Sequence, residues 1–218
     1  MQVRSCVSAI GVALLLTACG SANDANKDNF AKAIDAQLAT RCISVNPGGL
    51  LMSGNTFPLS TAIETAGKHG FGTTSEAQAK AANEEKFAKA DALVKEGLLT
   101  KKDAPVKPMF GKDMVPGRVY TLTDAGKKVL QRPDYSALCV GHYKVDEVVD
   151  FTVPGSAMGV TISRVNYIYS PTGVASWATS DAMKAAFPHL ASELASGQKG
   201  RATMVLKNDG WSAELSGF

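Results

Sequence analysis

Alternation of apolar and polar residues over residues 139–152 is the sequence feature that most constrains the fold. A period of two residues is typical of a strand with one face buried and the other in water. The apolar face would hold Cys139, Tyr143, Val145, Val149 and Phe151, and the polar face His142, Lys144, Asp146 and Asp150. Glu147 is the one charge on the apolar face. We expect it to pair with Arg164 on a neighbouring strand, the alternative being a buried functional charge.

The rest of segment 133–218 carries further strand and turn signals. Residues 158–170 are rich in β-branched residues and tyrosine, which favours a second strand. Asp209-Gly210 separates two short apolar runs and predicts a tight hairpin turn. A helix is predicted over residues 179–187, where Pro188 would end it. This segment is therefore predicted to be an antiparallel sheet with a covering helix.

Segment 29–132 is predicted to be mainly helical. Phe30, Ile34 and Leu38 lie at helical spacing and predict a short amphipathic helix over 28–40, with Asp28 or Asn29 as its N-cap. The longest helix is expected over 75–96, between Ser75 and Gly97. A loop is predicted over 100–117, a short strand over 118–122 and a short helix over 123–130. Because no parallel βαβ pattern occurs, the fold class is α+β, with the two segments packed as one compact body.

The order of elements after residue 86 resembles the end of a winged-helix domain of bacterial regulators. A long helix is followed by a basic loop and then by Tyr120-Thr121-Leu122-Thr123-Asp124-Ala125-Gly126. Lys and Arg exceed Asp and Glu over residues 86–132, which would suit phosphate contacts. The export signal described below argues against nucleic acid as a partner. We expect this surface to be a solvated face or a contact for anionic lipid headgroups.

Composition excludes several classes of protein. The chain has 218 residues, 45% of them hydrophobic, and a formal net charge of +3. Such a length suits one domain or two small ones with a real core. So mild a charge does not indicate nucleic-acid binding. Four cysteines are too few for a disulfide-built scaffold.

The N-terminal sequence has the pattern of an export signal. Arg4 is followed by an apolar run from Val7 to Leu16 that is too short to span a bilayer but suits a signal peptide. The run ends in Leu16-Thr17-Ala18-Cys19, which resembles the lipobox of bacterial lipoproteins. That resemblance implies that residues 1–18 are removed and that Cys19 is acylated. An ordinary secretory signal with a nearby cysteine is the alternative.

The sequence after Cys19 bears on the location of the protein. Residues 19–28 contain no apolar residue larger than Ala between Gly20 and Asp28, and read as a flexible tether. No Asp follows the cysteine directly. By resemblance to lipoprotein sorting, this favours the outer membrane, with the body facing the periplasm or the cell surface.

Two cysteines remain after export. Cys6 leaves with the signal peptide and Cys19 carries lipid, so Cys42 and Cys139 are the pair left in an oxidising compartment. We expect them to form one structural disulfide between the helical and the sheet segments. Two buried free thiols or a redox pair are the alternatives, although no Cys-x-x-Cys spacing supports a redox pair.

Several blocks together resemble uncharacterised proteobacterial lipoproteins. The resemblance covers most of the chain from about residue 90 onward, and it implies a compact envelope domain with no known activity. The blocks are the lipobox, Tyr120-Thr121-Leu122-Thr123, Leu138-Cys139-Val140-Gly141, Phe151-Thr152, Val165-Asn166-Tyr167-Ile168-Tyr169, Trp177-Ala178, Phe187-Pro188 and Gly210-Trp211.

No catalytic residue, metal site or cofactor is predicted. The histidines at 69, 142 and 189 show no metal-binding spacing, and Ser156 does not lie in a Gly-x-Ser-x-Gly elbow. Four aromatic residues are a candidate ligand or partner surface, with packing in the core as the alternative. They are Tyr167, Tyr169, Trp177 and Trp211.

The sequence therefore predicts a monomeric lipoprotein held at the outer membrane through lipid on Cys19. We expect a non-enzymatic binding or envelope-structural module with an envelope protein or lipid as its partner. A small-ligand or lipid carrier is the first alternative, and it should contain a large apolar cavity. A hydrolase is the second. A binding module should instead expose an apolar or charged patch on one face.

Overall fold

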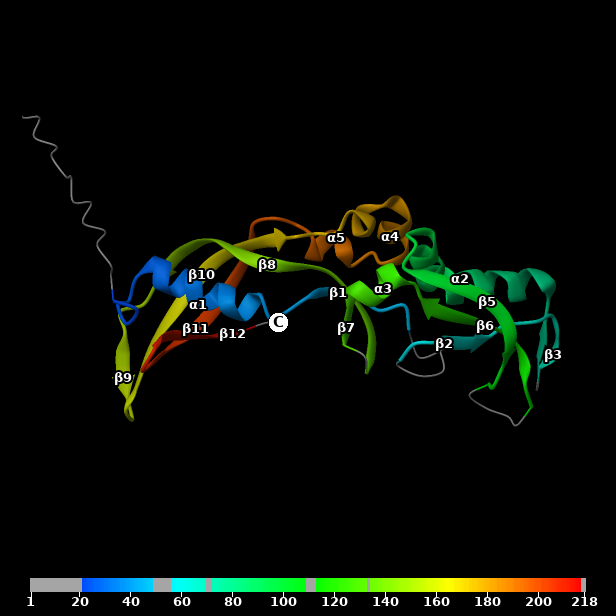
Figure 1. Ribbon diagram of the computed structural model, residues 1–218, viewed down its shortest axis with the longest axis horizontal. Helices are drawn as coiled ribbons and strands as arrows, with labels where there is room; N and C mark the ends of the chain where they lie inside the picture. Colours follow the sequence, from blue (N-terminus) through cyan, green and yellow to red (C-terminus); the bar gives the residue numbers. More distant parts are fainter. Residues whose placement is uncertain (1–20, 49–55, 70–71, 109–112, 133, 217–218) are drawn as a thin grey trace, which may run out of the picture.

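The computed structural model describes residues 21–48, 56–69, 72–108, 113–132 and 134–216. The predicted signal peptide and Cys19 lie outside the described residues. The molecule is elongated, with helix α1 near one end and helix α2 near the other (Figure 1). Its buried apolar residues form two clusters, which we name the sheet lobe and the helical lobe. Strand β8 runs from one lobe into the other, because its residues Leu138 and Val148 belong to different clusters.

The larger sheet is antiparallel and seven-stranded, with the order β1-β8-β10-β11-β12; most of it forms the sheet lobe, while β1 packs with the helical cluster. Strand β7 also pairs with β8, and β9 pairs with β10. The α+β class and the antiparallel sheet are thus confirmed. The strands are β1 (Ile43–Val45), β7 (Leu130–Arg132), β8 (Tyr135–Phe151), β9 (Gly155–Ala157), β10 (Val160–Thr172), β11 (Gln198–Lys207) and β12 (Gly210–Ser216).

Helix α1 (Lys27–Leu38) packs against the curled sheet, where it contacts β8 and β12. Phe30, Ile34 and Leu38 are fully buried, so the predicted apolar stripe is the face that enters the sheet lobe. The N-cap is Asn26, whose side chain accepts a hydrogen bond from the Asn29 amide at 2.8 Å. The predicted helix is confirmed, and its first residue lies one position earlier than expected. The predicted N-cap at Asp28 or Asn29 is wrong, because both residues lie in the first turn of the helix.

Two bulges in β8 change which of its residues face inward. The register of β8 against β10 shifts twice, and the shifts leave Asp146 and Val149 without opposite residues. Val145 and Val148 are therefore buried, whereas Val149 is 42% exposed, and its predicted place on the buried face is wrong. The predicted pairing of Glu147 with Arg164 is also wrong. Glu147 is exposed and lies 4.0 Å from the amine of Lys27.

The helical lobe combines helices with a three-stranded sheet of order β2-β6-β5. Its longest helix is α2 (Glu76–Lys95), which lies where the sequence predicted it and begins with a capping box between Ser75 and Gln78. The other elements are β2 (Leu59–Ala62), β3 (Gly67–His69), β4 (Gly72–Thr74), β5 (Leu99–Val106), β6 (Val115–Leu122), α3 (Asp124–Val129), η1 (Ser176–Thr179), α4 (Asp181–Ala186) and α5 (Leu190–Glu193).

Two predicted features of this region are wrong. Residues 100–117, expected to be a loop, supply the arms of the β5–β6 hairpin. Pro105 and Pro116 lie opposite each other near the end of the hairpin where its two strands are connected, so their missing amide hydrogens interrupt one place in the ladder only. Helix α4, expected to cover the sheet, packs against α2 instead. The sheet is covered by α1.

The chain therefore crosses between the lobes more than once. Helix α1, from the predicted helical segment, belongs to the sheet lobe, while α4 and α5, from the predicted sheet segment, belong to the helical lobe. Within the described ranges, no helix has the length and apolar character needed to cross a bilayer.

Candidate functional site

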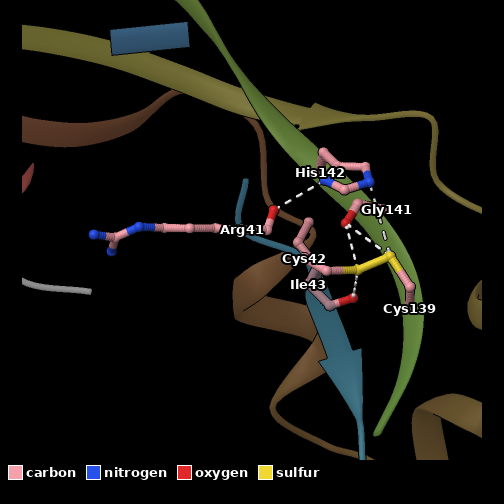
Figure 2. The surroundings of a disulfide bond; sticks show 6 residues. All are labelled: Arg41, Cys42, Ile43, Cys139, Gly141 and His142. Atoms are coloured by element: carbon pink, nitrogen blue, oxygen red, sulfur yellow. Dashed lines mark hydrogen bonds between the residues drawn. A yellow bond between two sulfur atoms is a disulfide. The ribbon is translucent and has the colours of Figure 1, made fainter. Parts of the chain in front are cut away.

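Cys42 and Cys139 lie at disulfide distance, with their Cα atoms 5.7 Å apart and a sequence separation of 97 (Figure 2). Cys42 directly precedes β1, a few residues after α1 ends, and Cys139 lies on β8. The pairing agrees with the predicted disulfide. It ties the segment that follows α1 to the part of β8 where the strand passes from the helical lobe into the sheet lobe.

His142 lies beside this disulfide (Figure 2). Its Nδ1 is 3.0 Å from the carbonyl oxygen of Arg41, and its Nε2 is 3.9 Å from the Cys139 sulfur. A carbonyl only accepts hydrogen bonds, so Nδ1 is the nitrogen that donates here. Cys42, Cys139 and His142 would offer three ligand atoms within 4.8 Å of one another. Because metal coordination by cysteine needs thiolates, the disulfide form does not supply this ligand set.

The structure divides the four predicted aromatic residues between the two lobes. Trp177 lies on η1 and packs against the helical cluster. Tyr167 and Tyr169 are buried in the sheet lobe. The ring centroids of Trp211 and Phe30 are 4.9 Å apart. The indole N–H of Trp211 donates to the carbonyl oxygens of residues 23 and 24. The four side chains therefore do not share one surface.

A groove of about 840 Å³ crosses β8, β10, β11 and β12, and we name it the sheet groove. A second hollow of about 520 Å³ adjoins it, with which it shares Asp150, Asn166, Arg201 and Ser216. Side chains alternate along β10, so Asn166 and Ile168 point away from the face that buries Val165 and Tyr167. The groove therefore opens on the side of the sheet that α1 does not cover.

The sheet groove combines apolar and cationic side chains. Val149 and Ile168 are its aliphatic residues. Lys199 and Arg201 line it from β11, and Arg164 lines the adjoining hollow. These three cations are exposed, and none forms a salt bridge within the described part of the chain.

Acidic side chains at this face are held by neighbours on the sheet. Asp150 accepts a hydrogen bond from the Asn166 amide at 2.7 Å, and Asp146 accepts one from the Ser170 hydroxyl at 2.5 Å. Asp150 keeps its negative charge, because asparagine is neutral. It is the one carboxylate among the described lining residues of the groove and the adjoining hollow, against three cations, so the net charge of this lining is positive and favours a ligand that carries negative charge.

Two tyrosines of β10 line the groove, although their rings belong to the core on the opposite face of the sheet. The ring centroids of Tyr167 and Tyr169 are 5.6 Å apart, and both residues line the groove from β10. Burial raises the pKa of Tyr167 to about 12, so this phenol stays protonated at neutral pH. The groove offers cations, hydrogen-bonding groups and apolar surface. These groups suit binding, and among its described lining residues no nucleophile lies beside a histidine base.

Sequence reasoning found Tyr167 and Tyr169 but missed Ile168, Lys199 and Arg201. A signal for the two cations was present, because Lys199 and Arg201 alternate with the residues that β11 buries. That signal shows which face they share. It does not show that the strands on either side of β11 leave a groove there.

Searches against protein-family models, curated proteins and solved structures find no match for this chain. No family can therefore be assigned. The sheet groove and the N-terminal sequence carry what can be inferred about function.

Proposed function

We propose that the protein is a monomeric, non-enzymatic binding module, anchored to the outer membrane through lipid on Cys19, that holds an anionic envelope partner in the sheet groove. The observation that carries this proposal is the exposed groove with its adjoining hollow, whose three cations lack salt bridges among the described residues. The lipobox-like sequence Leu16-Thr17-Ala18-Cys19 supports the anchor.

The form of the groove favours a binding module over a carrier. A carrier encloses its ligand in an apolar cavity that hides most of the ligand surface from water. The sheet groove instead lies on the surface, and both apolar clusters are filled by side chains such as Phe30 and Phe187, which are fully buried. An open groove with charged edges suits one face of a partner.

We also propose a winged-helix-like arrangement for the helical lobe. Helix α2 is followed by the β5–β6 hairpin, which β2 extends to three strands, and then by α3. Basic side chains of the hairpin are engaged by carboxylates: Arg118 lies 2.7 Å from Asp103, and Lys101 lies 3.2 Å from Asp91. Such pairing leaves less charge for phosphate contacts, which supports a structural role for this lobe.

Site-specific crosslinking in cells tests the groove. A photoreactive amino acid at Ile168 should give a discrete protein adduct, identified by mass spectrometry. The same amino acid at Lys102, an exposed residue of β5, is the control and should give none. Charge reversal by K199E with R201E should abolish the Ile168 adduct, because the partner would then meet like charge. Only lipid adducts at Ile168 would favour the carrier instead.

Fractionation tests the anchor. Cys19→Ser removes the thiol that would carry lipid, so the variant should move from the membrane fraction to the soluble fraction. A variant that stays with the outer membrane would refute anchoring through Cys19. Asn23→Ser, four residues further along the tether, is the control and should leave the protein in the membrane fraction.

A further inference from the structure

Exposed apolar side chains gather at one end of the sheet lobe. Among the described residues, five of the seven large apolar side chains that are exposed lie between residues 149 and 162. Val149 lines the sheet groove. The other four lie on or beside the β9–β10 hairpin, and we name them the apolar tip. They are Val153, Met158, Val160 and Ile162.

The apolar tip has no neighbour that covers it within the described chain. Strand β9 pairs with β10 alone, and β10 pairs with β11 only from Ile162, opposite Val205. The hairpin therefore extends past the rest of the sheet. Val153 is 88% exposed, and Met158 is exposed in full.

The turn of this hairpin presents an apolar residue where a polar one is usual. Met158 and Gly159 both have positive φ, 51° and 78°. A two-residue hairpin turn with this geometry favours Asn, Asp or Gly at its first position. Methionine is not favoured at positive φ, and the side chain of Met158 is not buried in this fold. Neither the turn nor the core therefore explains an apolar residue at this position.

The N-terminal tether is fixed at the same end of the molecule. The Ala22 carbonyl oxygen lies 3.1 Å from the place where a Cβ of Gly210 would be, directly beside the β11–β12 turn. Trp211 donates to the carbonyls of residues 23 and 24 at 3.1 and 3.2 Å. Gly210 pairs with Lys207, two residues beyond Val205, which lies opposite Ile162. Figure 1 shows the start of the described chain near β9.

We propose that the apolar tip inserts into the interfacial layer of the bilayer that carries the lipid anchor. This inference rests on the proposed acylation of Cys19, which precedes the first described residue, Ser21, by two positions. A lipid on Cys19 would bring the membrane to the end of the molecule where the tip projects. Apolar side chains at an interface bind by burial in the acyl boundary.

The charge beside the tip fits a lipid surface. Arg164 follows Ile162 by two residues on β10, so both side chains lie on the same face of the strand. Arg164 is exposed and has no salt bridge among the described residues. With Ile162 at the acyl boundary, its guanidinium can reach lipid phosphates. The two contacts would hold the lobe in one orientation and direct the helical lobe away from the membrane.

Fluorescence quenching in vesicles tests the proposal. The full-length acylated protein, with Met158→Cys carrying an environment-sensitive dye, is reconstituted in phosphatidylethanolamine–phosphatidylglycerol vesicles. Brominated acyl chains should remove most of the emission at residue 158. Met114→Cys is the matched control, since Met114 is an exposed methionine of the helical lobe and should not be quenched. Val153→Cys is a second labelled position with the same expected quenching.

The outcomes distinguish insertion of the apolar tip from acylation of Cys19. Mass spectrometry first establishes whether Cys19 is acylated. An acylated protein with unquenched dyes at residues 153 and 158 refutes insertion and leaves the proposed anchor standing. Absence of the acyl mass refutes the anchor and, with it, this inference. A dye that is shielded from water but not quenched by brominated lipid would show a protein contact at the tip, which also overturns the proposal.

Discussion

The ring of Tyr167 lies directly against the backbone of Gly200, its opposite residue on the neighbouring strand β11. A Cβ at position 200 would overlap with the phenol end of that ring. Tyr167 is 1% exposed and packs against Tyr169, so its ring has little room to move. A glycine in a strand interior ordinarily weakens a sheet, and here the aromatic ring covers the bare backbone.

Gly200→Ala should therefore destabilise the protein by about 1–3 kcal/mol, the usual cost of overpacking a filled core. Urea unfolding followed by circular dichroism measures the change. Gly155→Ala is the matched control, because nothing lies within 4 Å of a Cβ at that position. Equal effects of the two alanines would contradict the role assigned to the Tyr167 ring.

Tyr167→Phe should leave the free energy of unfolding within about 0.5 kcal/mol of wild type. The hydroxyl of Tyr167 is buried without a hydrogen-bond partner in the described structure, so removing it breaks no bond. Tyr120→Phe is the comparison. Tyr120 donates to Asp91 at 2.8 Å, and loss of that bond should cost about 1–2 kcal/mol.

Alkaline pH should destabilise wild type more than Tyr167→Phe. Burial raises the pKa of Tyr167 to about 12 from its usual value of 10.0. The folded state thus holds this proton more tightly than the unfolded chain does, and the full stability is present below pH 10. The free energy of unfolding should fall as the pH rises from 10 towards 12, and the fall should be smaller in Tyr167→Phe. Identical slopes would mean that Tyr167 ionises normally.

Local sequence signals predicted the helices well. The spacing of Phe30, Ile34 and Leu38, and the caps at Ser75 and Thr123, act within one turn of the chain and need no distant partner. Alternation over residues 139–152 predicted β8, and the β-branched residues and tyrosines of residues 158–170 predicted β10, for the same reason.

The missed features depend on residues far apart in the sequence. The bulge at Val149 exists only in the pairing of β8 with β10, and it brings that side chain into the sheet groove. Pro105 fits a strand only because Pro116 lies opposite it. The groove itself needs four strands in register. No periodicity in one segment encodes such a combination.

Asp91 joins three elements of the helical lobe, and Asp91→Ala should cost about 1–3 kcal/mol. Its carboxylate accepts from Tyr120 at 2.8 Å and lies 3.2 Å from Lys101 and 3.7 Å from Arg118. Its loss leaves the hydroxyl of Tyr120, a fully buried residue, without its acceptor. Chemical unfolding measures the effect.

Asp103→Ala is the matched control for Asp91→Ala. Its side chain is 63% exposed and bonds to Arg118 at 2.7 Å, which lowers the pKa of the Asp103 carboxyl. Exposed pairs of this kind contribute about 0–1 kcal/mol. A larger loss from Asp103→Ala than from Asp91→Ala would contradict the central role of Asp91.

The double variant Cys42→Ser/Cys139→Ser should lose about 2–5 kcal/mol of stability. The disulfide closes a loop with a sequence separation of 97, and opening it gives the unfolded chain more freedom. In urea unfolding, wild type in a thiol reductant should have the same free energy of unfolding as the double variant, which the reductant should not affect. Because Cys42 and Cys139 connect the segment after α1 to β8, hydrogen exchange should rise most in α1 and β1. A variant as stable as oxidised wild type would show that packing alone holds this junction together.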